Sequence, residues 1–285
     1  MSDRPDILRY SAFADDPDGG NPAGVVLDAA ALDDAEMQRI ATEVDDAETA
    51  FVTGRTGRAR TVRYFSPIAE VPFCGHATVA TAIAIAEREG PGTVRFATLV
   101  GEIVIETTDD DGLHAAFTSV DTDLAHFPEF VLDALLELLD VDRIHLDERY
   151  PPRMAFAGNW HPVVVIEHAA VFDGFVFDPG AVRAFIDAQG WPTTITVLHR
   201  LADAADGGLR FEARNLFPVG RITEDPATGS AAAAVGGYLR GLGVVHPPAR
   251  VLIEQGRHVG RPSKLTVDIP ERGGIVVSGR AVPIR

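Results

Sequence analysis

Apolar residues recur at two spacings along the chain, and these spacings divide it into short strands and helices. Apolar segments with a two-residue alternation or a continuous run predict strands, and apolar positions three or four residues apart predict helices. The predicted strands are 7–13, 23–27, 47–52, 60–65, 93–97, 102–106, 113–118, 153–157, 162–167, 194–199, 209–215, 250–255, 264–269 and 275–283. The predicted helices are 34–44, 76–89, 128–139, 179–189 and 231–242.

Two of these helices, 76–89 and 231–242, are apolar on every face, which predicts that each is buried inside a wrapping of strands. Each helix follows a loop of small residues, 74–78 in the first case and 224–230 in the second. The first-turn amides of a helix have no partners within it and carry partial positive charge, so each loop is predicted to bind an anion. The alternative is that small residues only ease close helix packing.

The two loops belong to a longer repeat within the sequence. Segments 63–67 and 214–218 both place an arginine four residues before a proline, and each segment precedes one of the loops. Segments 20–22 and 158–162 each end in a proline that leads into a valine-rich strand. Segments that recur in one order predict two similar halves. We place these halves at 1–120 and 121–285, with the last strand able to return to the first half.

We expect each half to be a curled, mostly antiparallel sheet around one central hydrophobic helix, which makes the chain an α/β (α+β) protein with two pseudo-symmetric domains. We also expect the halves to face each other, so that both helix N-termini bind one small carboxylate substrate. The amides of Gly75, His76, Gly229 and Ser230 would be its hydrogen-bond donors.

Glu48 is the strongest candidate for a general base. It lies beside Ala47 and Thr49 in a predicted strand that should be mostly buried. Partial burial raises the pKa of a carboxyl and lets it both accept and return a proton. The alternative is a glutamate at the rim of the sheet or one that makes a structural hydrogen bond.

His76 and Asp225 are further candidates for the chemistry. His76 opens the first buried helix, where the helix dipole disfavours an imidazolium, so a neutral ring would polarise a carbonyl or bind a hydroxyl of the substrate. Asp225 would orient the substrate or give it a proton. The alternative for either residue is a plain helix cap.

Cys74 is the only cysteine, which excludes an internal disulfide and a cysteine-rich metal site. A thiolate at a helix N-terminus is activated, so this residue also raises the hypothesis of a racemase. Racemisation with two bases needs a second base in the other half, where Asp225 and Pro226 stand and no thiol exists. The alternative is a small buried packing residue.

Composition and missing motifs argue against several other classes of protein. A net charge of -17 over 285 residues opposes binding to nucleic acid or to anionic membranes. The sequence contains no run of about 18 apolar residues, so we expect no membrane span. Residues 1–6 lack the apolar core of a signal peptide, so we expect a cytoplasmic protein. The sequence has no phosphate-binding loop, zinc-protease motif, paired CxxC or serine-nucleophile motif, and its nine histidines lack ligand spacing, so we expect no metal.

Six short segments then occur in one order along nearly the whole chain. They are 20–26, 48–52, 63–67 with Glu70, 74–78, 224–231, and 254–256 with 260–263. Together they resemble the PhzF-like phenazine-biosynthesis family, whose larger fold relatives are the diaminopimelate epimerases and proline racemases. The resemblance implies two pseudo-symmetric domains with the site between them, usually a homodimer, and no cofactor.

The resemblance also implies roles for individual residues. In the phenazine enzyme a glutamate moves a proton between two carbons of a dihydro-hydroxyanthranilate. Glu48 matches that base, His76 the histidine beside it, and Asp225 the aspartate of the second loop. The family base commonly follows Ser, whereas Ala47 stands here. We place the substrate-binding residues on the same segments, at Asn21, Cys74, Gly75, Ala77, Thr228, Gly229 and Ser230.

These observations together predict a cofactor-independent isomerase that acts on a small carboxylate. Two alternatives stay open. One is an epimerase or racemase that uses Cys74, and the other is a non-catalytic binding protein on the same scaffold. Cys74 matches the first thiol of the epimerase relatives, but Pro226 stands where the second would be, which favours the isomerase.

Overall fold

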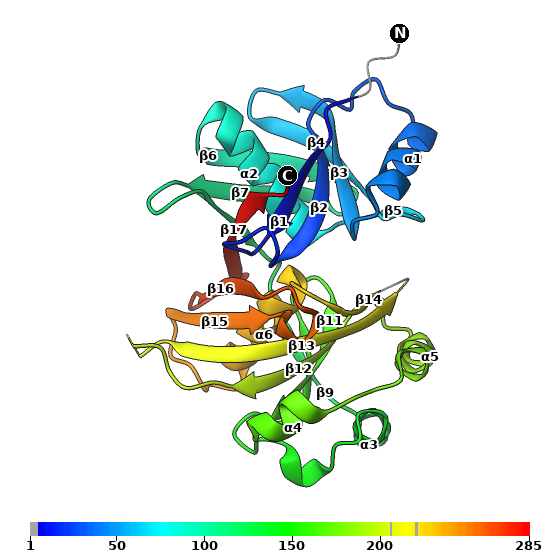
Figure 1. The fold of residues 1–285 in the computed structure, drawn as a ribbon. Coiled ribbons are helices and arrows are strands. Elements are labelled where there is room, and N and C mark those ends of the chain that lie inside the picture. The colour runs from blue at the N-terminus through cyan, green and yellow to red at the C-terminus, as the bar shows by residue number, and fades with distance from the viewer. Residues whose placement is uncertain (1–4, 206, 220–221) are drawn as a thin grey trace. The chain divides into compact units, whose positions relative to one another are not determined.

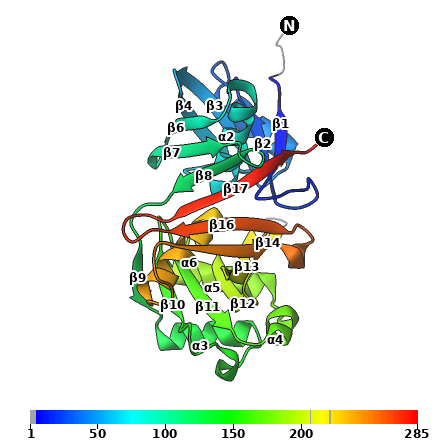
Figure 2. The same ribbon diagram turned by 90° about the vertical axis from the view of Figure 1, so that its left-hand side faces the viewer.

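The computed structural model describes residues 5–205, 207–219 and 222–285. Residues 1–4, which the signal-peptide argument used, lie outside this range. The chain divides into two compact units, whose ribbons are drawn in Figures 1 and 2. Unit 1 comprises residues 1–118 and 278–285, and unit 2 comprises residues 119–277. Each unit is described by itself below.

Unit 1 is a curled sheet in which neighbouring strands are mostly antiparallel. Its strands are β1 (Leu8–Ala12), β2 (Asn21–Val26), β3 (Glu48–Thr56), β4 (Ala59–Phe65), β5 (Glu70–Val71), β6 (Gly92–Thr98), β7 (Gly101–Thr108) and β8 (His114–Thr118). The pairs β1–β2, β3–β4, β4–β5, β6–β7 and β7–β8 are antiparallel, and β2–β3 and β4–β6 are parallel. The last strand, β17 (Val276–Pro283), returns to pair antiparallel with β1.

The helix α2 (Gly75–Glu89) forms the centre of unit 1. All residues from His76 to Ala86 are buried, and α2 contacts β1, β2, β3, β7 and β8, so strands enclose it as Figure 2 shows. The second helix, α1 (Asp34–Val44), lies on the outside of the sheet and packs Met37 and Ile40 against Phe51. Asp33 caps α1, because its side chain accepts a hydrogen bond from the amide of Glu36.

Unit 2 is also a curled sheet. Its strands are β9 (Asp123–His126), β10 (Arg153–Phe156), β11 (Trp160–Ile166), β12 (Ile195–Arg200), β13 (Leu209–Val219), β14 (Ile222–Asp225), β15 (Ala249–Gln255) and β16 (Ser263–Ile269). The pairs β9–β10, β10–β11, β12–β13, β13–β14 and β15–β16 are antiparallel, and β11–β12 and β13–β15 are parallel. Two short 3-10 helices, Arg143–His145 and Arg257–Val259, lie between strands.

The helix α6 (Gly229–Gly241) forms the centre of unit 2 and packs against β9, β10, β11 and β16. Its glycines let the surrounding backbone come close, because a Cβ at Gly237 would lie 2.7 Å from the Cβ of Thr122. The helices α3 (Glu129–Leu138), α4 (Ala169–Gly174) and α5 (Pro179–Gln189) cover the other face of the sheet. They bury a large apolar cluster that includes Leu135, Phe172 and Ile186.

The two units repeat one order of strands. In each unit an antiparallel pair of strands is followed by a helical crossover, which leads to a third strand that is parallel to the second. A fourth strand pairs antiparallel with the third, and a short hairpin strand connects it to the central helix. Strands β1 to β7 of unit 1 therefore correspond to β10 to β16 of unit 2. The prediction of two pseudo-symmetric α/β halves, each a sheet around one hydrophobic helix, is confirmed.

The strands β5, β9 and β14, the helix α4 and the two 3-10 helices were not predicted. Strands β5 and β14 contain two and four residues and carry Glu70, Glu224 and Asp225, so they show no apolar alternation. Their pairing with β4 and β13 comes from the hairpin and not from local propensity. The helix α4 has six residues, too few for a helical period to appear.

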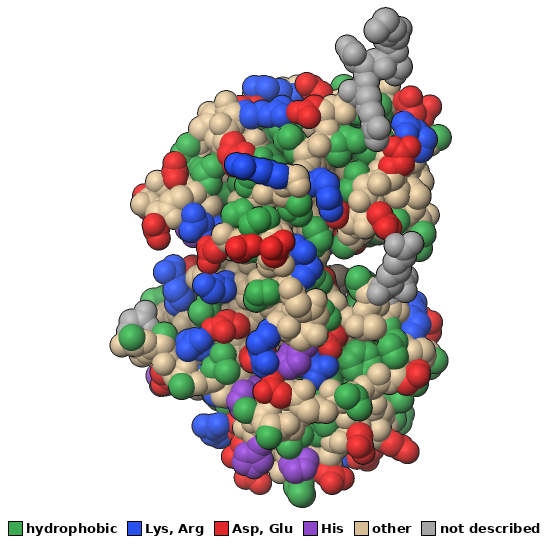
Figure 3. Space-filling view, in the orientation of Figure 1, with side chains coloured by type: hydrophobic (Ala, Val, Ile, Leu, Met, Phe, Trp, Pro, Cys, Tyr) green, Lys and Arg blue, Asp and Glu red, His purple; other side chains and the backbone are tan. Residues whose placement is uncertain are grey.

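Acidic and basic side chains intermix on the surface of both units, as Figure 3 shows for one face. Many of them form ion pairs within one unit, such as Arg39 with Glu43 and Arg250 with Asp268. Exposed pairs of this kind contribute about 0–1 kcal/mol each to stability. Among the described residues, no helix has the length and apolar character needed to cross a membrane.

Candidate active site

Glu48 is the first residue of β3, and its position follows from the parallel pairing of β3 with β2, which sets Glu48 opposite Ala23. The next three residues of the strand, Thr49 to Phe51, are all buried. The side chain of Glu48 itself is 22% exposed. The carboxylate therefore lies at the end of a buried strand, where solvent or a ligand can reach it.

The first turn of α2 lies beside Glu48. Cys74 is the N-cap residue in an extended conformation, and Gly75 and His76 follow as the first helical residues. The side chain of Cys74 makes no capping hydrogen bond, and the carbonyl of Cys74 instead accepts hydrogen bonds from the amide and hydroxyl of Thr78. His76 is inside the helix and 6% exposed, so the alternative that it is a plain helix cap is wrong.

Two side chains, those of His76 and Cys74, lie next to one oxygen of Glu48. The Oε2 atom lies 3.3 Å from Nε2 of His76 and 3.4 Å from Sγ of Cys74, whose thiol donates to it. Asn21, the first residue of β2, places its Nδ2 3.1 Å from Nδ1 of His76. Because an amide nitrogen donates, Nδ1 of His76 accepts and Nε2 carries the proton that faces Glu48.

Burial lowers the pKa of His76 to about 3, so the ring is neutral at physiological pH. A neutral ring with Nε2 at 3.3 Å from Glu48 lies beside the carboxylate without adding a positive charge there. The unit 1 cluster, which we define as Asn21, Glu48, Cys74 and His76, therefore has the character of an acid–base site built around one carboxylate.

The unit 1 cluster also has donor atoms that bind metals, since Glu48, Cys74 and His76 hold ligand atoms within 4.8 Å of one another. The hydrogen bond from Asn21 opposes a metal here. A histidine that binds a metal through Nε2 donates its Nδ1–H to an acceptor, whereas Nδ1 here faces a donor. As oriented in the structure, the amide of Asn21 favours the acid–base role.

A second group with metal-binding atoms lies in unit 2, at Asp173, Glu212 and His258. Arg257 already neutralises it, because its guanidinium lies 2.6 Å from Asp173 and 2.7 Å from Glu212. A cation would have to displace this guanidinium, so the group is better explained as an ion-pair network.

In unit 2 the loop before α6 is held by the end of β15, the start of β16 and the segment between them. The side chain of Gln255 accepts a hydrogen bond from the amide of Thr228 and donates to the hydroxyl of Thr228 and the carbonyl of Asp225. Gly256 has φ of +80°, and a Cβ there would lie 2.6 Å from the carbonyl oxygen of Pro226. Ser263 donates a hydrogen bond to the same carbonyl. Two of the conspicuous sequence segments, 254–256 and 260–263, thus act as the brace of this loop.

Asp225 ends β14, and its carboxylate accepts a hydrogen bond of 2.6 Å from the hydroxyl of Thr228. The N-cap residue of α6 is Thr228, so the alternative that Asp225 is a plain helix cap is wrong. Gly229 and Ser230 are the first two residues of α6, and Ser230 is partly exposed. Unit 2 therefore brings together the predicted residues Asp225, Thr228, Gly229 and Ser230.

The repeat also includes two ion pairs next to these loops, one in each unit. Arg63 of β4 lies 2.7 Å from Glu70 of β5, and Arg214 of β13 lies 2.5 Å from Glu224 of β14. Each pair holds the hairpin that leads into a central helix. The shared arginine-to-proline spacing in the sequence thus corresponds to an arginine–glutamate ion pair that occurs once in each unit.

The predicted site residues form two groups, one in each unit. In unit 1, Gly75 and Ala77 flank His76 in the first turn of α2, beside the unit 1 cluster. In unit 2, the loop and first turn of α6 form the other group. The expectation that both groups bind one substrate stays a prediction.

Sequence reasoning missed His161 and Gln255 as site residues. His161 is buried and contacts Ser230, and Gln255 braces Thr228. His161 lies in segment 158–162 of the repeat, and Gln255 lies in segment 254–256 of the family resemblance. Neither segment has a local pattern that reveals a contact so distant in the sequence.

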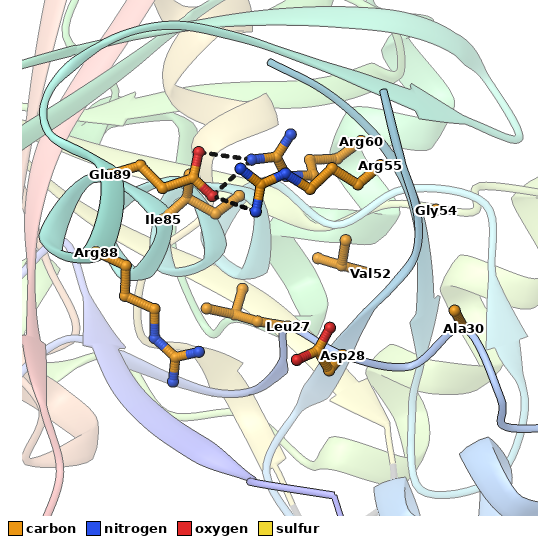
Figure 4. Close-up of a pocket in the computed structure, with 10 residues that line it drawn as sticks. All are labelled: Leu27, Asp28, Ala30, Val52, Gly54, Arg55, Arg60, Ile85, Arg88 and Glu89. Atoms are coloured by element: carbon orange, nitrogen blue, oxygen red, sulfur yellow. Dashed lines mark hydrogen bonds and ion pairs between the residues drawn. The ribbon is translucent and has the colours of Figure 1, made fainter. Parts of the chain in front are cut away.

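A cavity of about 320 Å³ lies elsewhere in unit 1, as Figure 4 shows. Its walls include Val52 and Ile85, and Glu89 accepts ion pairs there from Arg55 and Arg60. It adjoins the C-terminal end of α2, about 20 Å along the helix from its first turn. None of the predicted site residues lines it, so we do not assign the chemistry to it.

Comparison with known proteins agrees with this description of the fold. A family model described as phenazine biosynthesis-like protein, PhzC-PhzF, matches residues 10–285. An uncharacterized isomerase of Deinococcus radiodurans is 33% identical over 94% of this chain and 88% of its own length. A trans-2,3-dihydro-3-hydroxyanthranilate isomerase of Pseudomonas fluorescens is 32% identical over 88% of this chain and 86% of its own length.

Solved structures show the same fold. A PhzF-family phenazine biosynthesis protein of Bacillus anthracis has a TM-score of 0.82 and 25% identity, with 98% of this chain and 96% of that chain covered. A hydroxyproline epimerase of Agrobacterium vitis shares the fold, with a TM-score of 0.58 and 14% identity over 98% of this chain and 90% of that chain.

The fold and the family model define a class of small-molecule isomerases built on an epimerase-like scaffold. The chain belongs to the PhzF, phenazine biosynthesis-like family. It is accordingly an isomerase, as the sequence predicted.

Proposed function

We propose that this chain is a cofactor-independent isomerase that moves a proton between two carbons of a small cyclic carboxylate, with Glu48 as the acid–base residue. The observation that carries this proposal is the arrangement of the unit 1 cluster. One carboxylate oxygen, Oε2 of Glu48, accepts a hydrogen bond from the thiol of Cys74 and lies 3.3 Å from Nε2 of the neutral His76. Neutral donors hold an ionised carboxylate in position and still let it take a proton.

The proposed reaction needs no external reagent. Glu48 removes a proton from a substrate carbon next to a double bond, and the electron pair of that C–H bond moves into the conjugated system. The protonated Glu48 then returns the proton to another carbon of the same system, and the double bonds shift accordingly. Atoms and electrons balance within substrate and Glu48, so the product is an isomer.

Two helix N-termini supply donors for the substrate carboxylate under this proposal. Those of unit 1 are the amides of Gly75 and His76 at the start of α2, and those of unit 2 are the amides of Gly229 and Ser230 at the start of α6. Backbone amides at a helix start favour an anion and stabilise negative charge that develops during the reaction. Asp225, held by Thr228, would contact a polar group of the substrate.

The relative from Pseudomonas fluorescens suggests the substrate to test first. That protein is named for trans-2,3-dihydro-3-hydroxyanthranilate, which carries a carboxylate, an amine and a hydroxyl on a ring with two conjugated double bonds. We propose this compound, or a cyclic amino acid of the same kind, as the substrate. A homodimer and a cytoplasmic location stay predictions.

The test is turnover of trans-2,3-dihydro-3-hydroxyanthranilate by wild type and by two glutamine variants. Glu48→Gln should lower kcat by about 10²–10⁴, because it removes the only group that carries the proton. Glu70→Gln is the matched control, since Glu70 lies in the same unit and its side chain is 28% exposed against 22% for Glu48. Similar losses in both variants would remove Glu48 as the base.

A further inference from the structure

His161 is a buried histidine of unit 2 that the proposed chemistry does not use. It is the second residue of β11, its side chain is 1% exposed, and it directly precedes Pro162. Its Nε2 lies 3.2 Å from the hydroxyl oxygen of Ser230, the second residue of α6. A fully buried ring thus meets a partly exposed hydroxyl in the first turn of the central helix.

The Nδ1 side of His161 faces hydrogen-bond acceptors. The carbonyl oxygen of Thr194 lies 3.3 Å from Nδ1 and the hydroxyl oxygen of Thr194 lies 3.1 Å away. The hydroxyl proton of Thr194 is donated to the side chain of Asn215, at 3.0 Å, so this hydroxyl offers only lone pairs to the ring. Two acceptors on one side place the proton of the neutral imidazole on Nδ1.

The Nε2 atom of His161 is then a lone-pair acceptor. Ser230 donates its hydroxyl proton to it, and the hydroxyl oxygen of Thr193 lies beside both ring nitrogens, 2.9 Å from Nδ1 and 3.2 Å from Nε2. Burial lowers the pKa of His161 to about 4, so this neutral form persists at physiological pH. With its proton committed to the ring, the oxygen of Ser230 presents lone pairs to its exposed side.

We propose that His161 is a positioning residue that fixes the oxygen of Ser230 as a hydrogen-bond acceptor, so that the subsite at the start of α6 selects ligands with an O–H or N–H donor beside their carboxylate. This inference rests on the proposed function, in which the amide of Ser230 binds that carboxylate. It adds a requirement on the substrate, namely a donor group next to the acid.

The repeat provides independent support for this assignment. In unit 1 the residue before Pro22 is Asn21, and it contacts His76, the second residue of α2. In unit 2 the residue before Pro162 is His161, and it contacts the second residue of α6. In both units the residue before the proline determines whether the second residue of the central helix acts as a hydrogen-bond donor or acceptor. In unit 1 the partner becomes a donor, and in unit 2 it becomes an acceptor.

The test uses two planar acids of nearly equal shape. Pyrrole-2-carboxylate carries an N–H donor beside its carboxylate, and furan-2-carboxylate carries an oxygen at the same position. Calorimetry with wild type should give a Kd for the pyrrole acid at least about tenfold lower than for the furan acid, since a mismatched polar contact weakens binding by roughly that factor. Equal affinities, preference for the furan acid, or no binding of either acid would overturn the proposal.

The variants separate positioning from packing. Ser230→Ala should bring the ratio of the two Kd values close to one. His161→Ala should lower the ratio about fivefold or more, because the freed hydroxyl of Ser230 can then donate to the furan oxygen. His161→Gln, whose side-chain oxygen can accept the Ser230 proton, should restore most of the preference. If His161→Ala weakens both acids equally and leaves the ratio unchanged, the histidine only packs and the proposal fails.

This binding experiment is independent of turnover. Absence of isomerisation with an intact preference for the pyrrole acid would remove the proposed reaction and keep the donor requirement. Isomerisation that depends on Glu48, combined with equal binding of the two acids, would keep the reaction and remove the role of His161.

Discussion

Glu224→Gln removes the negative charge from a buried ion pair in unit 2. The partner, Arg214, is held by Glu224 at 2.5 Å and 3.1 Å and also donates to the carbonyls of Phe172 and Phe175. Its guanidinium carbon lies 3.6 Å from the ring centre of Phe175. The two charged side chains are 8% and 7% exposed, so the variant leaves a buried arginine without its counter-charge.

The repeat supplies a matched control for this change. Arg63 and Glu70 occupy the corresponding positions in unit 1, but their side chains are 25% and 28% exposed, and Arg63 also has Asp34 as a partner at 2.6 Å. Removing one partner of a buried pair costs about 3–5 kcal/mol of unfolding free energy. A solvated pair contributes about 0–1 kcal/mol. Glu224→Gln should therefore lower the unfolding free energy by at least about 2 kcal/mol more than Glu70→Gln does.

The assay is urea denaturation followed by two signals. Both tryptophans, Trp160 and Trp191, lie in unit 2, so their fluorescence reports the unfolding of that unit. Far-ultraviolet circular dichroism reports both units. The fluorescence midpoint should fall clearly in Glu224→Gln and little in Glu70→Gln. Equal stability losses in the two variants, or a loss below about 1 kcal/mol for Glu224→Gln, would refute the reasoning about burial.

Three further predictions concern the unit 1 cluster. Burial lowers the pKa of His76 to about 3, below its value of about 6.5 in an unfolded chain. Between these two pH values the unfolded state binds more protons than the folded state. The unfolding free energy should therefore decrease as the pH falls from about 6.5 towards 3. Urea titrations at several pH values should show a shallower loss in His76→Gln, and identical slopes would contradict the assignment. Cys74→Ala should keep kcat within about tenfold, because the thiol contacts Glu48 and His76, each at 3.4 Å, and does not carry the proton in the proposed reaction. Loss of all turnover would favour the epimerase alternative. Asn21→Asp should raise the affinity for Zn²⁺ by about 10–100-fold over wild type, because a carboxylate would accept Nδ1–H of His76 and leave Nε2 for the metal. Unchanged zinc binding in calorimetry would show that Asn21 does not control the tautomer of His76.

Much of the fold could be predicted from the sequence because its signals are local. Helices α2 and α6 are apolar on all faces over more than ten residues, and the cap at Asp33 is a local motif. The repeat was visible because Arg63 and Arg214 each precede a proline by the same number of residues. Strands β5 and β14 stayed hidden, because a neighbouring strand specifies them and their own residues do not.

The candidate site could be predicted in part. Glu48 and His76 were found because each lies at or near the start of an element that the hydrophobic pattern defines. No local pattern encodes their contact, which joins two different elements, or the tautomer that Asn21 imposes on His76 from 55 residues away. His161 and Gln255 were missed for the same reason, since their partners Ser230 and Thr228 are 69 and 27 residues away.

The most direct test of the central claim follows the proton itself. Wild type and Glu48→Gln are each incubated in deuterated water with trans-2,3-dihydro-3-hydroxyanthranilate, and deuterium in the ring carbons is measured by mass spectrometry and NMR. If Glu48 carries the proton, wild type places deuterium on the carbon that gains hydrogen, and Glu48→Gln incorporates none while Glu70→Gln behaves as wild type. Equal incorporation by wild type and Glu48→Gln would contradict the account.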